Sequence, residues 1–310
     1  MSSPRSRPEQ QHGLLVLDKP QGPTSTQCLE RIKKELCQKK IGHAGTLDPL
    51  ATGVLLVALG RATKLTPYLM DGDKVYSGWI QLGLTSDTYD IQGEIQSEED
   101  WRNVSGDAIQ REIAAWREWT EHTVPPFSAA KHQGKPHYSM ARRGEEPPQK
   151  TKPLRIDRAE VLAIQLPFVQ FRVACSKGTY IRSLAHSLGM RLGCGAVLSE
   201  LTRKESSPYG LDRAVGLEDL LHNPGALSAN VLSLPEALPH WPKLSLSSDQ
   251  AAGIKNGNWL RVDELKGYTP RGEGERALFV TTQEAPIALM ETRLWRGQLY
   301  WAILRGLWSS

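Results

Sequence analysis

One carboxylate near the start of the chain stands in a setting suited to contact with a ligand. Asp48 is the only acid in residues 42–53, a stretch made mainly of small and apolar residues. Gly42 and Gly45 permit backbone angles and close approaches that a side chain would block, and Pro49 stiffens the chain directly after the acid. The same composition also suits an ordinary turn, so this stretch alone leaves both interpretations open.

Elements on both sides of this stretch are expected to hold it on a rigid scaffold. Residues 54–59 form an apolar run typical of a buried strand, and residues 14–17 form another. Between these strands, apolar residues at helical spacing predict an amphipathic helix over residues 26–37 that leads into the acidic loop. We therefore expect Asp48 to be presented from a loop anchored in the core.

The rest of the first 215 residues mixes strands and helices irregularly. Residues 75–84 and the period-two pattern of residues 169–175 predict strands, whereas residues 109–116 and 180–192 predict helices. The steady alternation of a doubly wound sheet is missing from this pattern. The sequence therefore predicts an α+β fold with a mixed, largely antiparallel central sheet flanked by helices.

The composition is that of an ordinary globular protein. The 310 residues are 39% hydrophobic and 23% charged, with a net charge of +4. No apolar run approaches the roughly 20 residues that span a bilayer, and residues 1–12 lack the apolar core of a signal peptide, so we expect a cytoplasmic protein. The spacing of the four cysteines, Cys28, Cys37, Cys175 and Cys194, favours reduced thiols and no metal site.

Three segments are expected along the chain. Residues 1–11 read as a flexible tail, residues 12–240 as one large domain and residues 241–310 as a small β-rich domain. A proline-bounded stretch, residues 238–242, is the expected linker. Beyond this linker, short apolar runs alternate with glycine and charged turns, which is typical of β structure.

Several blocks of the sequence occur together in the order found in one family of enzymes. The blocks are residues 18–25 (DKPQGPTS), 42–53 (GHAGTLDPLATG), 87–93 (DTYDIQG), 125–145 and 177–196. In these blocks the chain resembles the TruB-type pseudouridine synthases, which isomerise a uridine in the T-arm of tRNA. The resemblance covers most of residues 12–215, and the C-terminal pattern is similar to the PUA RNA-binding module that often follows this catalytic domain.

The resemblance implies a role for particular residues. It makes Asp48 the catalytic acid, Arg182 its ion-pair partner and Tyr76 the residue packed against the target base, with Tyr180 and Leu201 lining the uracil pocket. It further implies that His43, Asp90 and Lys131 contact the substrate RNA. Four residues are expected to support the site: Lys19, Pro20, Gly42 and Gly45.

The implied chemistry suits a single carboxylate. The bond between N1 and C1′ of uridine must break, the uracil must turn, and the base must rejoin the sugar through C5, which then loses its proton. An arginine within a few Å of Asp48 would favour the ionised acid, which can attack C1′ or remove a ribose proton. Either Asp48 or a water near Tyr76 could take the C5 proton. Neither cofactor nor metal is required.

The expected substrate is uridine 55 of the tRNA T-arm, which must be flipped out of the stacked loop before it can react. We expect a stand-alone monomer that needs no protein partner and no membrane. Two alternatives remain open from the sequence. One is a pseudouridine synthase directed by a guide RNA, and the other is an RNA-binding or tRNA-folding protein in which catalysis is secondary.

Overall fold

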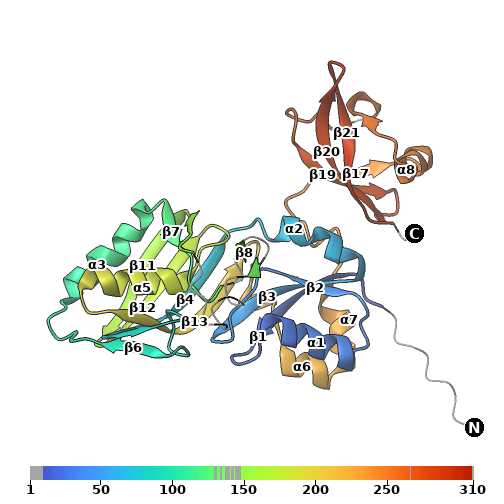
Figure 1. Cartoon of the computed structure of the whole chain (residues 1–310). Helices are drawn as coiled ribbons and strands as arrows, with labels where there is room; N and C mark the ends of the chain where they lie inside the picture. Colours follow the sequence, from blue (N-terminus) through green and yellow to red (C-terminus); the bar gives the residue numbers. More distant parts are fainter. Residues whose placement is uncertain are drawn as a thin grey trace, which may run out of the picture.

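The computed structural model describes residues 10–128, 131–132, 135–136, 140, 143, 148–265 and 267–308. Figure 1 shows a main body built on one long sheet and a smaller body formed by the C-terminal strands. The predicted tail, residues 1–11, lies mostly outside the described residues. Gln10 and Gln11 are described, and they hydrogen-bond to the Cys37 carbonyl at 2.9 Å and to the Gln38 side chain at 3.0 Å. Ordered contacts therefore begin slightly before residue 12.

The main sheet has 10 strands and confirms the predicted fold class. Neighbouring strands are antiparallel except for two parallel pairs, β13 with β3 and β1 with β15. The short strands β2, β14 and β16 pair with β3, β13 and β1 beside the main path. In order across the sheet, the main strands are β11 (Ile156–Gln165), β12 (Phe168–Cys175), β4 (Lys74–Leu82), β13 (Ala196–Ser206), β3 (Ala51–Leu59), β1 (Gly13–Lys19) and β15 (Val215–Gly216), and the short ones are β2 (Ile41–Ala44), β14 (Tyr209–Gly210) and β16 (Val231–Leu232).

Two of the helices lie close to the ranges expected from the sequence, 26–37 and 180–192, although the first ends two residues earlier than expected. Helix α1 (Ser25–Glu35) starts with a capping box, in which the side chains of Thr24 and Gln27 each bond the other residue's backbone N–H. Helix α5 (Ile181–Leu192) ends at Gly193, whose φ of 76° lies in the left-handed region that glycine favours. Both ends are thus set by local chemistry.

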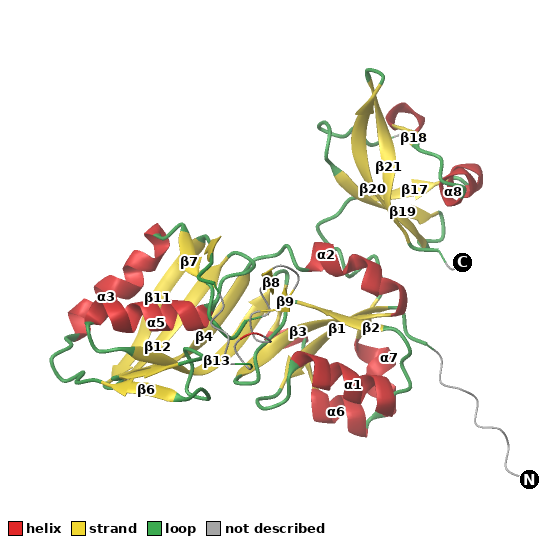
Figure 2. Cartoon of the chain, viewed as in Figure 1, coloured by secondary structure: helices red, strands yellow, loops and turns green. Residues whose placement is uncertain are grey.

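Other helices and short strands cover the faces and edges of the sheet (Figure 2). Among the described residues, none of the helices combines the length and the apolar character needed to cross a bilayer. These elements are α2 (Thr66–Leu69), α3 (Gly106–Ala114), α6 (Leu217–His222), α7 (Pro224–Asn230), β5 (Leu84–Ser86), β6 (Ile95–Glu98), β7 (Glu121–Thr123), β8 (Lys131–His132), β9 (Lys135–Pro136), β10 (Thr151–Pro153) and the 3-10 turns η1 (Gly60–Leu65), η2 (Ala115–Glu118) and η3 (Leu211–Arg213).

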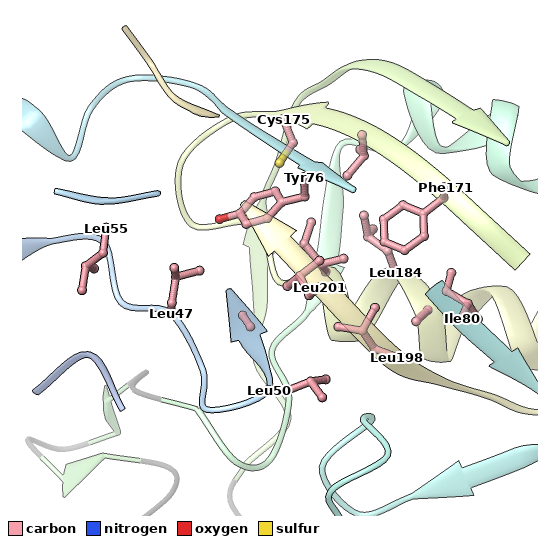
Figure 3. Close-up of a cluster of buried hydrophobic side chains, with 14 of the residues drawn as sticks. Leu47, Leu50, Leu55, Tyr76, Ile80, Phe171, Cys175, Leu184, Leu198 and Leu201 are labelled. Carbon is pink, nitrogen blue, oxygen red and sulfur yellow. The ribbon is translucent and has the colours of Figure 1, made fainter. Parts of the chain in front are cut away.

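Strand β1 is buried on both faces, which explains its unbroken apolar run. Leu15 and Leu17 belong to one core cluster, whereas Leu14 and Val16 belong to another on the opposite face. Figure 3 shows the first cluster, where side chains from the Asp48 loop meet those of the central strands. The loop that carries Asp48 and the sheet therefore share one packed core.

The stretch around Asp48 is less of a loop than its composition suggests. Residues 42–44 belong to strand β2, and residues 51–53 begin strand β3, so only residues 45–50 are irregular. The predicted helix over residues 26–37 consequently leads into a strand first, not directly into the loop. Pairing between β2 and β3 was not evident from the sequence because glycine and histidine give strand β2 no apolar alternation.

The C-terminal strands form a separate sheet of five strands, confirming the small β-rich unit. The expected linker is packed, because Leu238 is buried and the Trp241 ring meets Tyr68 of α2 edge-on at 5.1 Å. Across the same junction, the side chain of Arg61 donates to the Leu307 carbonyl at 3.3 Å. In sheet order, with one helix and one turn beside it, this unit comprises β17 (Lys243–Leu246), β19 (Arg276–Thr281), β20 (Pro286–Trp295), β21 (Gln298–Gly306), β18 (Leu260–Arg261), α8 (Ser248–Lys255) and η4 (Val262–Glu264).

Candidate active site

Asp48 stands on a loop that the core fixes on both sides. Its neighbours Leu47 and Leu50 are buried, and the Ser25 hydroxyl both accepts from the Leu47 N–H at 2.9 Å and donates to the Leu47 carbonyl at 3.0 Å. On the other side of Asp48, the carbonyl of Pro49 accepts from the Gly22 N–H at 2.9 Å. The Asp48 side chain nevertheless stays 43% exposed. The acid is therefore held firmly at its backbone and open at its carboxylate.

Arg182 is the cation that faces this acid. Its Nε lies 2.9 Å from Oδ2 of Asp48, although the two residues are far apart in the sequence. The two terminal nitrogens of the guanidinium donate to the carbonyls of Thr88 at 2.8 Å and Phe127 at 2.9 Å. Only 6% of the Arg182 side chain is exposed. Each of the three guanidinium nitrogens thus has a different partner.

Asp90 lies behind this ion pair and not at the surface of the pocket. One of its carboxylate oxygens is 3.7 Å from the Nε of Arg182, while the other accepts from the Thr88 hydroxyl at 2.8 Å and the Gln92 N–H at 3.0 Å. Burial raises the pKa of Asp90, and the nearby Arg182 opposes that rise. This placement favours support of Arg182 over direct contact with RNA.

A pocket of about 250 Å³ opens beside the Asp48 carboxylate. Three of the residues expected to meet the uracil, Tyr76, Tyr180 and Leu201, line it together with Asp48 and Arg182. They come from β4, the start of α5 and β13, so only the tertiary fold assembles them. The full lining is Gly45, Thr46, Leu47, Asp48, Ala51, Met70, Lys74, Tyr76, Ser128, Lys177, Gly178, Thr179, Tyr180, Ile181, Arg182, Leu201 and Arg203.

Tyr76 forms the apolar floor of this pocket. Its ring lies among Leu201, Cys175 and Leu47 in the core (Figure 3). Burial raises the pKa of the Tyr76 phenol, so the hydroxyl is held neutral. A neutral aromatic ring next to a carboxylate suits a planar, uncharged base.

Arg203 is a component of the site that the sequence analysis missed. This fully buried side chain donates from Nε to the Val54 carbonyl at 2.6 Å and from a terminal nitrogen to the Gly45 carbonyl at 3.0 Å. It thereby ties the first residue of the Asp48 loop to strand β3. Gly45 has a φ of +88°, and a Cβ there would lie 3.4 Å from the Arg203 guanidinium. No local signal in the sequence marks Arg203, because it stands among the polar and charged residues at the end of strand β13.

Two of the predicted supporting residues lie at the opposite end of the same loop. The buried ammonium of Lys19 donates to the carbonyls of Ala51 at 2.8 Å and Pro20 at 2.9 Å. Burial lowers the pKa of Lys19, and the charge of Asp48 partly opposes that effect. Gly42, the fourth predicted support, lies in β2 opposite Ala58. Lys19 and Arg203 therefore bind the two ends of the loop that carries Asp48.

Comparison with known proteins identifies the family. The profile of the N-terminal domain of TruB family pseudouridylate synthases matches residues 33–181. The tRNA pseudouridine synthase B of Nitratidesulfovibrio vulgaris strain Miyazaki F is 54% identical over 305 residues, covering 98% of this chain and 99% of that relative. The chain belongs to the TruB family of pseudouridylate synthases. A TruB-type relative from Geobacter sulfurreducens, also named tRNA pseudouridine synthase B, is 42% identical over 79% of this chain and 81% of its own.

Solved structures agree with the TruB family fold. The chain superposes on a protein in the crystal structure of a Cbf5–Nop10–Gar1 complex with a TM-score of 0.72 and 26% identity, over 96% of this chain and 85% of that one. It also matches a chain of an H/ACA RNP bound to a substrate RNA containing 2′-deoxyuridine, with a TM-score of 0.68, 26% identity and the same coverage. The C-terminal sheet fits the PUA-like module of such proteins.

His43 and Lys131 are two further residues of this TruB family member that are predicted to contact RNA. His43 lies in β2, half-buried, and does not line the cavity. Burial lowers its pKa, and its Nδ1 has no partner among the described residues. Lys131 begins the short strand β8, but its side chain lies outside the described part of the chain. Their contact with RNA stays a prediction.

The described residues hold no group of three or more histidine, cysteine or acidic side chains that could bind a metal ion. Three of the four cysteines are buried and Cys37 is exposed, and all four are free thiols. Burial raises the pKa of Cys175 to about 12, which keeps this thiol protonated beside the pocket floor.

Proposed function

We propose that this TruB family enzyme converts uridine 55 in the T-arm of tRNA to pseudouridine, with Asp48 as its catalytic group. The observation that carries the proposal is the Asp48–Arg182 ion pair in the lining of a pocket that Tyr76 and Tyr180 also line. Relatives 53–54% identical over nearly the whole chain are named tRNA pseudouridine synthase B. Site chemistry and family membership thus support the same reaction.

The pocket supports a reaction on a flipped base. A uridine stacked within an RNA loop cannot reach Asp48, so the nucleotide must leave the stack, which costs a few kcal/mol. Tyr76 provides a ring against which the uracil can pack, and Tyr180 and Leu201 close the sides. Contacts between these side chains and the base offset part of the cost of flipping. His43 and Lys131 are proposed to contact the RNA outside the pocket.

Asp48 then acts on the sugar. As a carboxylate it can add to C1′ while the bond to N1 breaks, or it can remove a ribose proton and release the base as a glycal is formed. The freed uracil turns within the pocket and rejoins C1′ through C5. In the first route this step breaks the bond between C1′ and the Asp48 oxygen, and in the second the glycal takes its ribose proton back from Asp48. The C5 proton finally leaves to Asp48 or to a water near Tyr76. No step in either route changes the oxidation state of a protein group.

We propose that the enzyme acts in the cytoplasm as a stand-alone monomer, with residues 12–240 as the catalytic domain and residues 241–310 as a PUA-like RNA-binding domain. The sequence identities to known proteins favour a stand-alone enzyme over one that is directed by a guide RNA. Identity to the tRNA pseudouridine synthase B of N. vulgaris is 54%, whereas identity to the chain in the Cbf5–Nop10–Gar1 complex is 26%. The former comparison also covers 99% of the relative.

The test uses purified protein and an unmodified tRNA transcript labelled with tritium at C5 of its uridines. Reattachment through C5 displaces the label, so tritium released to water counts turnovers. We expect release without any added RNA or protein, and none from a transcript in which uridine 55 is replaced by cytidine. Release that requires a guide RNA, or that persists in the substituted transcript, would contradict the proposal.

A further inference from the structure

The start of helix α5 is attached to the segment of residues 121–153 by a series of hydrogen bonds. The backbone N–H of Tyr180 donates to Nε2 of His122 at 3.0 Å, and the Ser183 hydroxyl donates to the Thr123 carbonyl at 2.6 Å. Between these two bonds, Arg182 donates to the Phe127 carbonyl at 2.9 Å. Tyr180 and Arg182 both line the pocket. Residues 122–127 of the segment thus meet the wall of the pocket.

His122 lies at the base of this segment, where its two ends pair. Strand β7 runs antiparallel to β10, with His122 opposite Lys152. The other ring nitrogen of His122, Nδ1, is 3.2 Å from the Lys152 carbonyl. The His122 ring is buried and lies 5.7 Å from the Tyr180 ring, between centroids. One imidazole therefore joins both strands of the base to the first residue of the pocket wall.

The partners of His122 fix its protonation state. A backbone N–H can only donate, so Nε2 must accept, and a carbonyl can only accept, so Nδ1 must carry the proton. The imidazole is therefore the neutral Nδ1–H tautomer. Protonation of Nε2 would place two donors against each other and break the bond to Tyr180.

The charges around His122 favour the same state. Burial lowers the pKa of His122, and the Lys152 ammonium lowers it further, although the bond to the Lys152 carbonyl acts in the opposite direction. From β10 the ring faces Lys152, whose ammonium lies 5.2 Å from the centre of the Tyr180 ring, and from α5 it faces the Tyr180 phenol. Its neighbour on β7, Glu121, is exposed, and no carboxylate forms an ion pair with His122 in the described part of the chain.

We propose that His122 is a positioning residue for uridine isomerisation, which acts as a neutral hydrogen-bond acceptor that fixes Tyr180 and the start of α5 against the base of the 121–153 segment. Through this bond it keeps the Tyr180 ring and, two residues later, the Arg182 guanidinium in place around Asp48. This inference rests on the proposed function, because it assigns His122 to that same pocket.

The test compares two variants of His122 with one control variant. His122→Leu removes both bonds and preserves burial, whereas His122→Gln returns an acceptor oxygen near the position of Nε2. His222→Gln, an exposed histidine of α6 whose Nδ1 bonds the Glu218 carbonyl, serves as the matched control. The readouts are kcat and KM for tritium release from the tRNA transcript, with circular dichroism and thermal unfolding to verify the fold.

We expect His122→Leu to lower kcat by about ten- to a hundred-fold with KM unchanged, since a misplacement of about 1 Å at a reacting group has an effect of that size. His122→Gln should recover most of kcat, and His222→Gln should match the wild type. Wild-type kcat in folded His122→Leu would overturn the proposal. If His122→Leu fails to fold, the test rests on His122→Gln. A folded His122→Gln protein with a kcat as low as that of Arg182→Ala would overturn the proposal. Absence of activity in the wild type would instead count against the proposed function.

Discussion

The guanidinium of Arg182 links Asp48 to two backbone carbonyls: its Nε is 2.9 Å from Oδ2 of Asp48, and its terminal nitrogens donate hydrogen bonds to the carbonyls. The carbonyls belong to Thr88 and Phe127, which lie on separate loops. Because these bonds fix the guanidinium, the carboxylate that pairs with it is fixed as well. Orientation of Asp48 is therefore a property of the fold and not of its own loop alone.

Replacement of Asp48 by Asn should abolish pseudouridine formation and leave tRNA binding nearly unchanged. The amide keeps the size of the side chain but can neither attack C1′ nor remove a proton. The measurements are tritium release and a filter-binding Kd on the same transcript. Asp107→Asn, an exposed acid at the start of α3, is the matched control and should match the wild type. Turnover by a clean Asp48→Asn preparation would remove Asp48 from its assigned role.

The change Arg182→Lys should sharply reduce activity although it keeps the positive charge. A lysine ammonium cannot reach two carbonyls and a carboxylate with the fixed geometry of a guanidinium. Arg182→Ala should in addition destabilise the fold by about 3 kcal/mol, since Asp90 would remain buried without its counter-charge. Single-turnover rates and urea unfolding measure the two effects.

The control for these arginine variants lies on the same helix. Arg191→Lys changes a half-exposed arginine that lies 3.7 Å from Glu112 and 4.9 Å from the centre of the Trp119 ring, outside the pocket, so the rate should match the wild type. A wild-type rate in Arg182→Lys would show that charge alone, without the fork, is sufficient.

The buried Arg203 should be needed for both stability and rate. In Arg203→Met the carbonyls of Gly45 and Val54 lose their donors, which should reduce the free energy of unfolding by about 1–3 kcal/mol. The loop of Asp48 should then move, so kcat should fall more than KM changes. The neighbouring exposed residue offers a control, Lys204→Gln, which should change neither quantity. Equal kcat values for the two variants would show that Arg203 does not position the loop.

Stability should fall as the pH drops below about 6.5. Burial lowers the pKa of His43, His122 and His186 below the ordinary value of 6.5, so the unfolded chain binds protons there before the folded one does. Above pH 6.5 these residues are neutral in both states and their contribution is constant. Urea unfolding at about pH 8 and about pH 5.5 measures the slope. His186→Gln should flatten it, and a slope unaffected by this change would contradict the assignment.

Much of the site could be predicted because it depends on residues that are close together in the sequence. The glycine-rich surroundings of Asp48 drew attention to this acid, and the resemblance to a known family pointed to Asp48 itself and to Tyr76, Arg182 and Leu201. The caps of α1 and α5 follow from side chains within a few residues of each helix end. Such features depend on neighbours in the sequence, so the sequence displays them directly.

Other components depend on partners far away in the chain. Nothing near Arg203 in the sequence shows that it will meet Gly45, and nothing near His122 points to Tyr180. The position of Asp90 behind Arg182 could not be predicted either. Residues 87–93 resemble the family, but the resemblance does not show which way the Asp90 side chain faces. Strand β2 was missed since its weak alternation becomes a strand only through pairing with β3.

By itself, the sequence indicated the mixed α+β architecture through its periodicity, and its resemblance to a known family indicated the family and the acid that we propose as catalytic. Only the tertiary structure decided which side chains hold that acid in place. Hydrogen bonds form between atoms within about 3 Å of each other, and it is folding that brings residues 48, 90, 182 and 203 within reach of one another or of one loop.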